Sequence, residues 1–288
     1  MKSLKEIIMR NKIISILIVM TLAVLLFSGC SSAGSNVLIS EKNISAFDSV
    51  HVMTSSTRIE FVTSDNYGLE IFVPGRLSPE WDVTNGHLTI FAKKRVISFG
   101  PSALLNSYVK VYYPKGAVFH DISLKASSGS IEVPQVAVSD LNLSTSSGKI
   151  AASVENCETI DATTSSGSVT LSGSGDSATA LTVNTTSGSI RADGAVWRDV
   201  RTKTHSGSTE ISGDLLGNTD VKTSSGNVKL SVSSDPSAYG YSLTPNSGSI
   251  HWDGVKMGKP ARSSGSFENN IAVDTSSGSI RVDFNKPK

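Results

Sequence analysis

The chain has 288 residues, enough for one large or two ordinary domains, and its 38% hydrophobic content is typical of a folded protein. Its formal net charge is only +1, so the sequence argues against nucleic acid as a partner. Aromatic residues make up only 6% of the chain, so a core has to be built mainly from aliphatic side chains.

The N-terminus has the features of an export signal. Basic residues precede an uncharged apolar run over residues 13–27, which is short for a membrane span but suits a signal peptide. The following Leu26-Phe27-Ser28-Gly29-Cys30 resembles the lipobox of bacterial lipoproteins, although Phe27 stands where Leu is usual. We therefore expect a signal peptide over 1–29, a lipid on Cys30 that holds the protein on a membrane of the cell envelope, and a flexible tether over 30–44. An uncleaved anchor or a plain signal peptide with an incidental cysteine is the alternative.

Residues 45–117 are expected to form a β-region that caps a repeat structure and is continuous with it. In "VHVMTSSTRIEF", residues 50–61, apolar side chains alternate on both sides of a short polar bend, with Thr57 at its centre. The segment "WDVTNGHLTI" follows the same pattern more loosely around Asn85-Gly86. Asn-Gly also suits a two-residue hairpin, so both interpretations stay open for this segment.

A short Ser-Gly motif recurs at intervals of 19, 19, 21, 19, 19, 22 and 30 residues. A period near 20 is typical of stacked repeats, in which each repeat buries its apolar face against the next. The recurring glycines are Gly129, Gly148, Gly167, Gly188, Gly207, Gly226, Gly248 and Gly278.

Apolar residues occupy fixed columns seven and five residues before each glycine and two and four residues after it. Of these 32 positions 29 are apolar, and the three exceptions are Thr202, Thr209 and Thr219. Alternation predicts strands with one buried face, but the parity changes at the glycine, so the chain has to turn a corner there. We expect the glycines to be structural corners that adopt positive φ, with the preceding Thr and Ser side chains on the core side.

These patterns predict an all-β protein whose residues 118–288 form a parallel β-solenoid of stacked repeats of about 20 residues. An antiparallel β-sandwich is the alternative, because several connectors also suit hairpins. The long insertion before the last repeat contains Gly265 in a Ser-Gly sequence whose flanks lack the apolar columns. Sheet edges at the ends of the stack are a possible route to self-association.

The sequence offers no recognisable catalytic, metal or cofactor site. The five histidines fall in separate segments without metal-ligand spacing, and with Cys30 lipidated, Cys157 has no partner for a disulfide or zinc site. One outward column carries Arg191, Glu210, Lys229, His251 and Arg281. A solvated, salt-bridged face explains it, and so does contact with an acidic glycan. A carbohydrate-active β-helix enzyme that acts on an acidic cell-surface glycan is the alternative function.

The exported N-terminus, the opening "FDSVHV", the strand "YVKVYYPKG" and the serial "TSSGSI" motifs together resemble the "putative adhesin", or toast-rack, family of bacterial envelope proteins. The resemblance covers roughly residues 45–284. It implies an all-β repeat structure without enzymatic activity, with a role in adhesion or in envelope-stress responses. The expected partner is a protein or glycan of the cell envelope, which the sequence does not identify.

Overall fold

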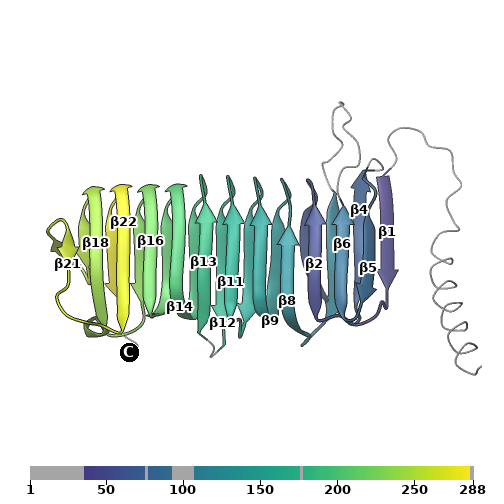
Figure 1. The fold of residues 1–288 in the computed structure, drawn as a ribbon, viewed down its shortest axis with the longest axis horizontal. Helices are drawn as coiled ribbons and strands as arrows, with labels where there is room; N and C mark the ends of the chain where they lie inside the picture. The colour runs from purple at the N-terminus through teal and green to yellow at the C-terminus, as the bar shows by residue number, and fades with distance from the viewer. Residues whose placement is uncertain (1–35, 75–76, 93–106, 176–177, 286–288) are drawn as a thin grey trace, which may run out of the picture. The chain divides into compact units, whose positions relative to one another are not determined.

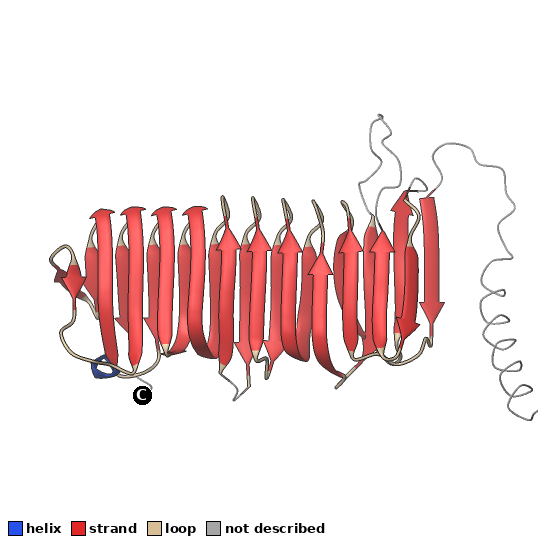
Figure 2. Cartoon of the chain, viewed as in Figure 1, coloured by secondary structure: helices blue, strands red, loops and turns tan. Residues whose placement is uncertain are grey.

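The computed structural model describes residues 36–74, 77–92, 107–175 and 178–285, and almost all of its regular structure is β-strand (Figures 1 and 2). One 3-10 turn, Pro236–Ala238, is the exception within the described ranges. The expected signal peptide and Cys30 lie outside the described residues.

The strands form two faces that are joined into one 23-stranded sheet. The first face has the order β5-β6-β2-β8-β9-β11-β13-β14-β16-β22-β18-β21, and the second β1-β4-β7-β3-β9-β10-β12-β14-β15-β17-β23-β19-β20. Strands β9 and β14 are long and run from the second face into the first.

The strands of the first face are β2 (Ser49–Thr54), β5 (Glu80–Thr84), β6 (His87–Ala92), β8 (Val118–Lys125), β11 (Thr159–Thr164), β13 (Thr179–Thr185), β16 (Asn218–Ser225), β18 (Tyr239–Ser247), β21 (Ala261–Arg262) and β22 (Asn269–Ser277). Those of the second face are β1 (Asn36–Lys42), β3 (Arg58–Ser64), β4 (Gly68–Pro74), β7 (Tyr108–Pro114), β10 (Ile150–Glu155), β12 (Val169–Ser174), β15 (Thr209–Leu216), β17 (Val228–Val232), β19 (Ile250–Trp252), β20 (Val255–Met257) and β23 (Ile280–Phe284). The two shared strands are β9 (Ile131–Thr145) and β14 (Ile190–Ser206).

The parallel β-solenoid predicted from the repeats is confirmed, and the antiparallel sandwich is not. Every neighbouring pair in the middle of both faces is parallel, and the antiparallel pairs β1–β4, β4–β7, β5–β6, β18–β21 and β19–β20 lie towards the two ends. Repeats of constant length place each strand parallel to the equivalent strand of the next coil and in register with it. The antiparallel strands end the stack, where no further repeat follows.

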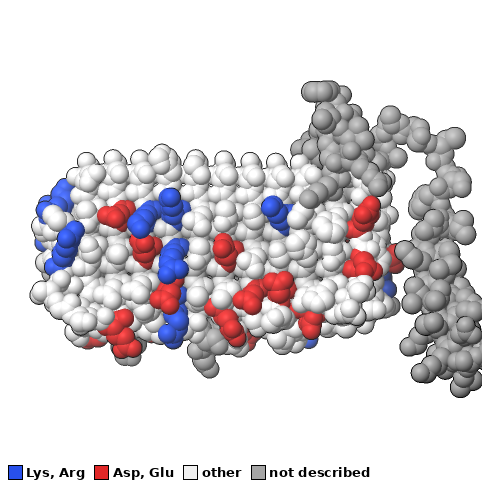
Figure 3. Space-filling model, in the orientation of Figure 1, with Lys and Arg blue, Asp and Glu red and all other residues white. Residues whose placement is uncertain are grey.

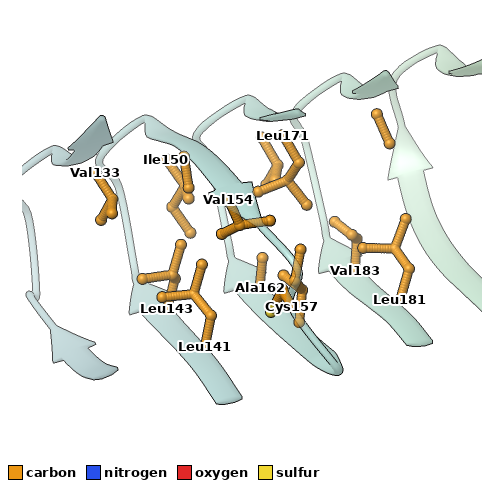
Figure 4. Close-up of a cluster of buried hydrophobic side chains, with 14 of the residues drawn as sticks. Val133, Leu141, Leu143, Ile150, Val154, Cys157, Ala162, Leu171, Leu181 and Val183 are labelled. Atoms are coloured by element: carbon orange, nitrogen blue, oxygen red, sulfur yellow. The ribbon is translucent and has the colours of Figure 1, made fainter. Parts of the chain in front are cut away.

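The interior is filled by the apolar columns predicted from the sequence. Strand β11 alternates exposed and buried residues along its length, and Ile160 lies in register with Leu141 on one side and Leu181 on the other. On the opposite face Ile150 and Val169 form the corresponding ladder. Figure 4 shows Leu141, Leu181 and Ile150 among the side chains that fill the space between the faces. Each coil therefore buries its aliphatic residues against its own opposite strand and against both neighbouring coils.

The coils do not follow one another in sequence order at the C-terminal end. The last coil, β22 and β23, lies between the coil of β16 and β17 and the coil of β18 and β19 (Figure 1). The insertion after β19 carries the chain past the end of the stack through β20 and β21, and β22 then returns to the inner position. The repeat pattern predicted correctly which strands form each coil, but it did not predict the spatial order of the coils at this end.

Two segments near the N-terminus bear on the expectations from the sequence. One contradicts an expectation, and the other decides between two alternatives. Residues 36–42, expected within a tether, form strand β1. Val37 and Ile39 lie on the same side of this strand and pack against the core, whereas Leu38 between them is exposed. Asn85 and Gly86 both have positive φ and join β5 to β6 as an antiparallel hairpin, so the hairpin interpretation of this segment is right.

Candidate interaction surface

The recurring glycines lie at the bends between the two faces, and the reason for glycine is space. A Cβ on Gly148 would lie 1.9 Å from the carbonyl oxygen of Gly129, and one on Gly167 would lie 1.8 Å from that of Gly148. Positive φ, which we expected at all eight corners, occurs only at Gly248, with φ of 109°. The expectation of positive φ is therefore wrong for the other seven. The coils approach so closely at the bend that a side chain does not fit.

A threonine lies three residues before six of the eight glycines, and it holds successive bends together. The Thr164 hydroxyl donates to the Gly148 carbonyl oxygen at 3.3 Å and accepts from the Gly167 N–H at 3.1 Å. The same carbonyl contact recurs in other coils, through Thr145, Thr185, Thr204, Thr223 and Thr275. These buried hydroxyls satisfy backbone groups at the bend, as expected.

The serine directly before each glycine points outward, which contradicts the expected core position. Ser147 and Ser166 are exposed, and so are their equivalents in the other coils. The bend shifts the alternation, so the two residues between the threonine and the glycine both face solvent. Along the bend edge in Figure 3 these residues form an uncharged ridge.

The outward charges predicted from the sequence lie in one row on the second face. Glu210 is in register with Arg191 on one side and Lys229 on the other, and it forms ion pairs with them at 3.0 Å and 3.2 Å. Lys229 is in register with Arg281, which is paired with Asp283 of its own strand at 2.6 Å. Because about half or more of each of these basic side chains is exposed, the row is screened by solvent and adds little to stability.

The row includes His251, as predicted, and extends by one residue beyond the predicted column. His251 on β19 continues it beside Arg281, and Lys256 on β20 follows through the antiparallel pair β19–β20. We call Arg191, Glu210, Lys229, Arg281, His251 and Lys256 the basic row. Sequence reasoning missed Lys256 because the hairpin that brings it into register lies outside the repeat.

These charges lie side by side along a face and do not converge in a cleft. The insertion before the last repeat forms the edge strands β20 and β21. Within the described ranges, no group of three or more His, Cys, Asp or Glu side chains is placed to hold a metal ion. On the first face, acidic and basic side chains are interspersed (Figure 3).

Cys157 lies in the core and is not a reactive thiol. Its thiol contacts the carbonyl oxygens of Ser139 and Thr159 at 3.4 Å and 3.1 Å. Desolvation by burial raises the pKa of Cys157 to about 12, so the group is protonated at neutral pH. A protonated, buried thiol is a poor nucleophile and a poor metal ligand.

A second polar cluster, which the sequence analysis did not identify, lies on the second face near the N-terminal end. The hydroxyls of Tyr108 and Tyr112 both donate to the Glu70 carboxylate, one to each oxygen. The hydrogen bond to Glu70, followed by desolvation, raises the pKa of Tyr108 to about 12. Desolvation and the Glu70 charge raise the pKa of Tyr112 as well. Both phenols therefore stay protonated and keep donating to the carboxylate.

The family model that describes this architecture, Toastrack DUF4097, matches residues 48–283. The chain belongs to the Toastrack DUF4097 family. The match covers both faces of the solenoid, which confirms the family resemblance and the repeat fold inferred from the sequence. No curated protein matches the sequence. Across the described part of the chain, no helix has the length and apolar character needed to cross a bilayer.

Several solved structures are similar to the chain at low sequence identity. A "putative adhesin" from Bacteroides fragilis is 14% identical, with 85% of this chain and 97% of that chain covered and a TM-score of 0.51. A "putative lipid binding protein" from Parabacteroides distasonis is 17% identical, with 90% and 98% covered and a TM-score of 0.38. A "putative adhesin" from Parabacteroides merdae is 14% identical, with 88% and 97% covered and a TM-score of 0.41. At these identities, the first of these structures supports the Toastrack fold and does not assign a ligand.

Proposed function

We propose that this Toastrack protein is a non-enzymatic binding scaffold of the cell envelope, held on a membrane by a lipid on Cys30. In this proposal the solenoid acts as an adhesin and presents the basic row to an acidic envelope glycan. The observation that carries the proposal is the alignment of Arg191, Lys229, Arg281 and Lys256 on neighbouring strands of one face.

The geometry of the row suits a linear polyanion. Adjacent strands lie about 4.8 Å apart, so five strand steps from Arg191 to Lys256 give a row of about 24 Å. The guanidinium groups of Arg191 and Arg281 offer planar, paired donors to carboxylates. Glu210 sits between two of the cations and fixes them in place, and their exposed side chains can still contact a ligand.

The arrangement favours binding over catalysis. Glycoside cleavage requires two carboxyl groups on opposite sides of the scissile bond, at a defined separation. The acidic groups in and beside the row, Glu210 and Asp283, instead pair with neighbouring basic residues on a flat face. An adhesin needs only an extended complementary surface, which this face supplies.

The experiment compares two variants that remove the same number of positive charges. The first carries Arg191→Ala, Lys229→Ala and Arg281→Ala in the basic row. The second carries Arg201→Ala, Lys203→Ala and Lys222→Ala on the first face. Binding of polygalacturonate to the full chain in detergent is measured by biolayer interferometry at several salt concentrations.

We expect the basic-row variant to bind at least tenfold more weakly and the first-face variant to stay within about threefold of the unmodified protein. Binding should weaken as salt rises, because exposed charges are screened. Equal losses in the two variants would show that net charge alone attracts the polymer. No binding by the unmodified protein would remove the acidic glycan from the proposal.

A further inference from the structure

A hollow opens on the second face at the N-terminal end, away from the basic row. It has a volume of about 460 Å³ and lies among the end of β1, the loop between β3 and β4, the start of β4 and Tyr112 of β7. The loop and the segment after β1 are tied by the Ile44 N–H, which donates to the Tyr67 carbonyl at 3.1 Å. This volume is within the range of small-ligand pockets.

The floor of the hollow is Gly68. Register places Gly68 between Lys42 of β1 and Tyr112 of β7, so the two neighbours carry side chains and Gly68 carries none. A Cβ at Gly68 would lie 2.8 Å from the Glu41 carbonyl oxygen and 3.7 Å from the Tyr112 Cβ. Close strand packing therefore requires glycine here, and the missing side chain leaves a depression in the sheet surface.

One side of the hollow is a carboxylate held in a fixed orientation. Glu70 receives one tyrosine hydroxyl on each oxygen, from Tyr108 and Tyr112. Tyr108 is itself held by its stack on Phe72, with ring centroids 5.6 Å apart, and by Lys110, whose Nζ lies 4.6 Å from the Tyr108 ring centroid. Each oxygen of an ionised carboxylate has two acceptor positions, so Glu70 can also accept hydroxyl groups of a ligand.

The remaining walls combine aromatic surface with small polar groups. Tyr67 stands edge-on to Phe47, with ring centroids 4.7 Å apart, and Tyr112 forms the wall beside Glu70. Ser40, Ser64 and Asn66 add hydroxyl and amide groups. Aromatic rings beside several hydrogen-bonding groups match a sugar ring, which has apolar C–H faces and a rim of hydroxyls. The lining carries two carboxylates, Glu41 and Glu70, against one cation, Lys42, and this excess of negative charge disfavours an acidic sugar.

We propose that this hollow is a binding site for an uncharged saccharide, with Glu70 accepting hydrogen bonds from sugar hydroxyls. The site differs from the basic row in location, charge and ligand class. This proposal can therefore be tested independently of the acidic-glycan proposal.

The experiment measures binding of maltotriose, cellotriose and triacetylchitotriose to the full chain in detergent micelles. Isothermal titration calorimetry gives the affinity, and saturation-transfer NMR reports contact between sugar C–H groups and protein. We expect at least one of the three to bind with a millimolar or lower Kd. Glu70→Gln should weaken that binding at least tenfold, because a charged acceptor is replaced by a neutral one.

Matched variants distinguish the loss of a specific binding site from a general effect of substitution on the protein. Glu132→Gln removes a carboxylate from the same face outside the hollow, and it should bind like the unmodified protein. Asn66→Ala, in the exposed loop, should weaken binding at least threefold, whereas Asn142→Ala on the first face should not. Asn66→Ala keeps the test valid if Glu70→Gln folds poorly.

Two results would overturn the proposal. One is the absence of binding by all three trisaccharides at 20 mM. The other is equal binding by the hollow variants and their controls. The basic-row triple variant should bind the neutral trisaccharide normally, so failure of one proposal is distinguishable from failure of the other.

Discussion

Each bend glycine lies against a carbonyl oxygen in the bend of an adjacent coil, and there is no room between them for a methyl group. The contact would be 2.2 Å or shorter at all eight positions. Since seven of the eight have ordinary φ, a side chain is excluded by the neighbouring coil and not by the residue's own backbone. The sequence predicted the corner from the parity change, but a single repeat contains no sign of the contact with the next.

Gly167→Ala is therefore expected to be strongly destabilising. The new Cβ meets backbone on the preceding coil, which cannot move without displacing the threonine contacts, and we expect a loss of at least about 2 kcal/mol. Urea unfolding followed by circular dichroism measures it. Gly258→Ala is the control, because a Cβ there meets nothing within 4 Å, and its midpoint should hardly change.

The three threonines that interrupt the apolar columns are buried and have no protein partner for their hydroxyls. Thr202, Thr209 and Thr219 are at most 3% exposed, and their hydroxyl oxygens lack a hydrogen-bond partner within the described residues. The bend threonines instead donate to a carbonyl oxygen of the preceding coil, as Thr164 does to Gly148. The same residue type therefore has opposite effects on stability at the two kinds of position.

Thr209→Val should stabilise the protein. Removing a buried hydroxyl without a partner relieves a desolvation cost of about 1–3 kcal/mol, and valine fills the same space. Thr209 lies between Ile190 and Val228, so the valine joins an apolar ladder. Thr164→Val is the contrasting variant and should lower stability by about 1–3 kcal/mol, because it leaves the Gly148 carbonyl and the Gly167 N–H without a partner. A lower urea midpoint for Thr209→Val would contradict the prediction.

At the scale of the strands, some features could be predicted from the local sequence pattern, and others depend on the chain topology. Alternation identified the inward residues of both strands in each coil, and the parity change located the bends. The outward row followed from the same columns, because residues at equal offsets fall in register in a parallel stack. The carboxylate and tyrosines of the hollow could not be predicted this way. They meet through the antiparallel pair β4–β7, which has no counterpart in the repeat.

The coil formed by β22 and β23 supports its neighbour β18, although β18 precedes it in sequence. Strand β18 pairs only with β22 and with the two-residue strand β21 among the described strands. Phe284, the last residue of β23, packs against Tyr239 and Trp252 with ring centroids 5.5 Å and 4.9 Å apart. These contacts close the interior at this end.

A chain that ends after Glu268 should lose the structure of β18. We expect the amides of Tyr239–Ser247 to exchange at least a hundredfold faster in hydrogen-exchange mass spectrometry, because their parallel partner is gone. The amides of β10 and β11 provide the internal control and should keep their protection. Unchanged protection of β18 would mean that its coil moves onto β16 in the shortened chain.

At the scale of the whole molecule, the solenoid keeps its two candidate sites far apart on one face. The hollow uses β1, β4 and β7, and the basic row runs from β14 to β20. In the order of the second face, several strands without either feature separate them. A variant in one site should therefore leave the other intact, since distant substitutions usually act independently.

Anchoring is a property of the whole chain and has its own test. Cys30→Ala should move the protein from the membrane fraction to the soluble fraction, because the proposed lipid then has no attachment residue. Cys157→Ala serves as the matched control and should stay in the membrane fraction, since that thiol is buried in the core. Unchanged fractionation of Cys30→Ala would refute lipidation at this residue.

The inner position of the final coil also bears on how the protein matures. A chain synthesised from its N-terminus delivers β18 and β19 before β22 and β23, the strands that separate them from β16 and β17. The gap between these coils can be filled only after β23 has been made. A product cut short before β22 therefore leaves β18 and β19 without their parallel partners, and a protease can cleave such an unprotected end.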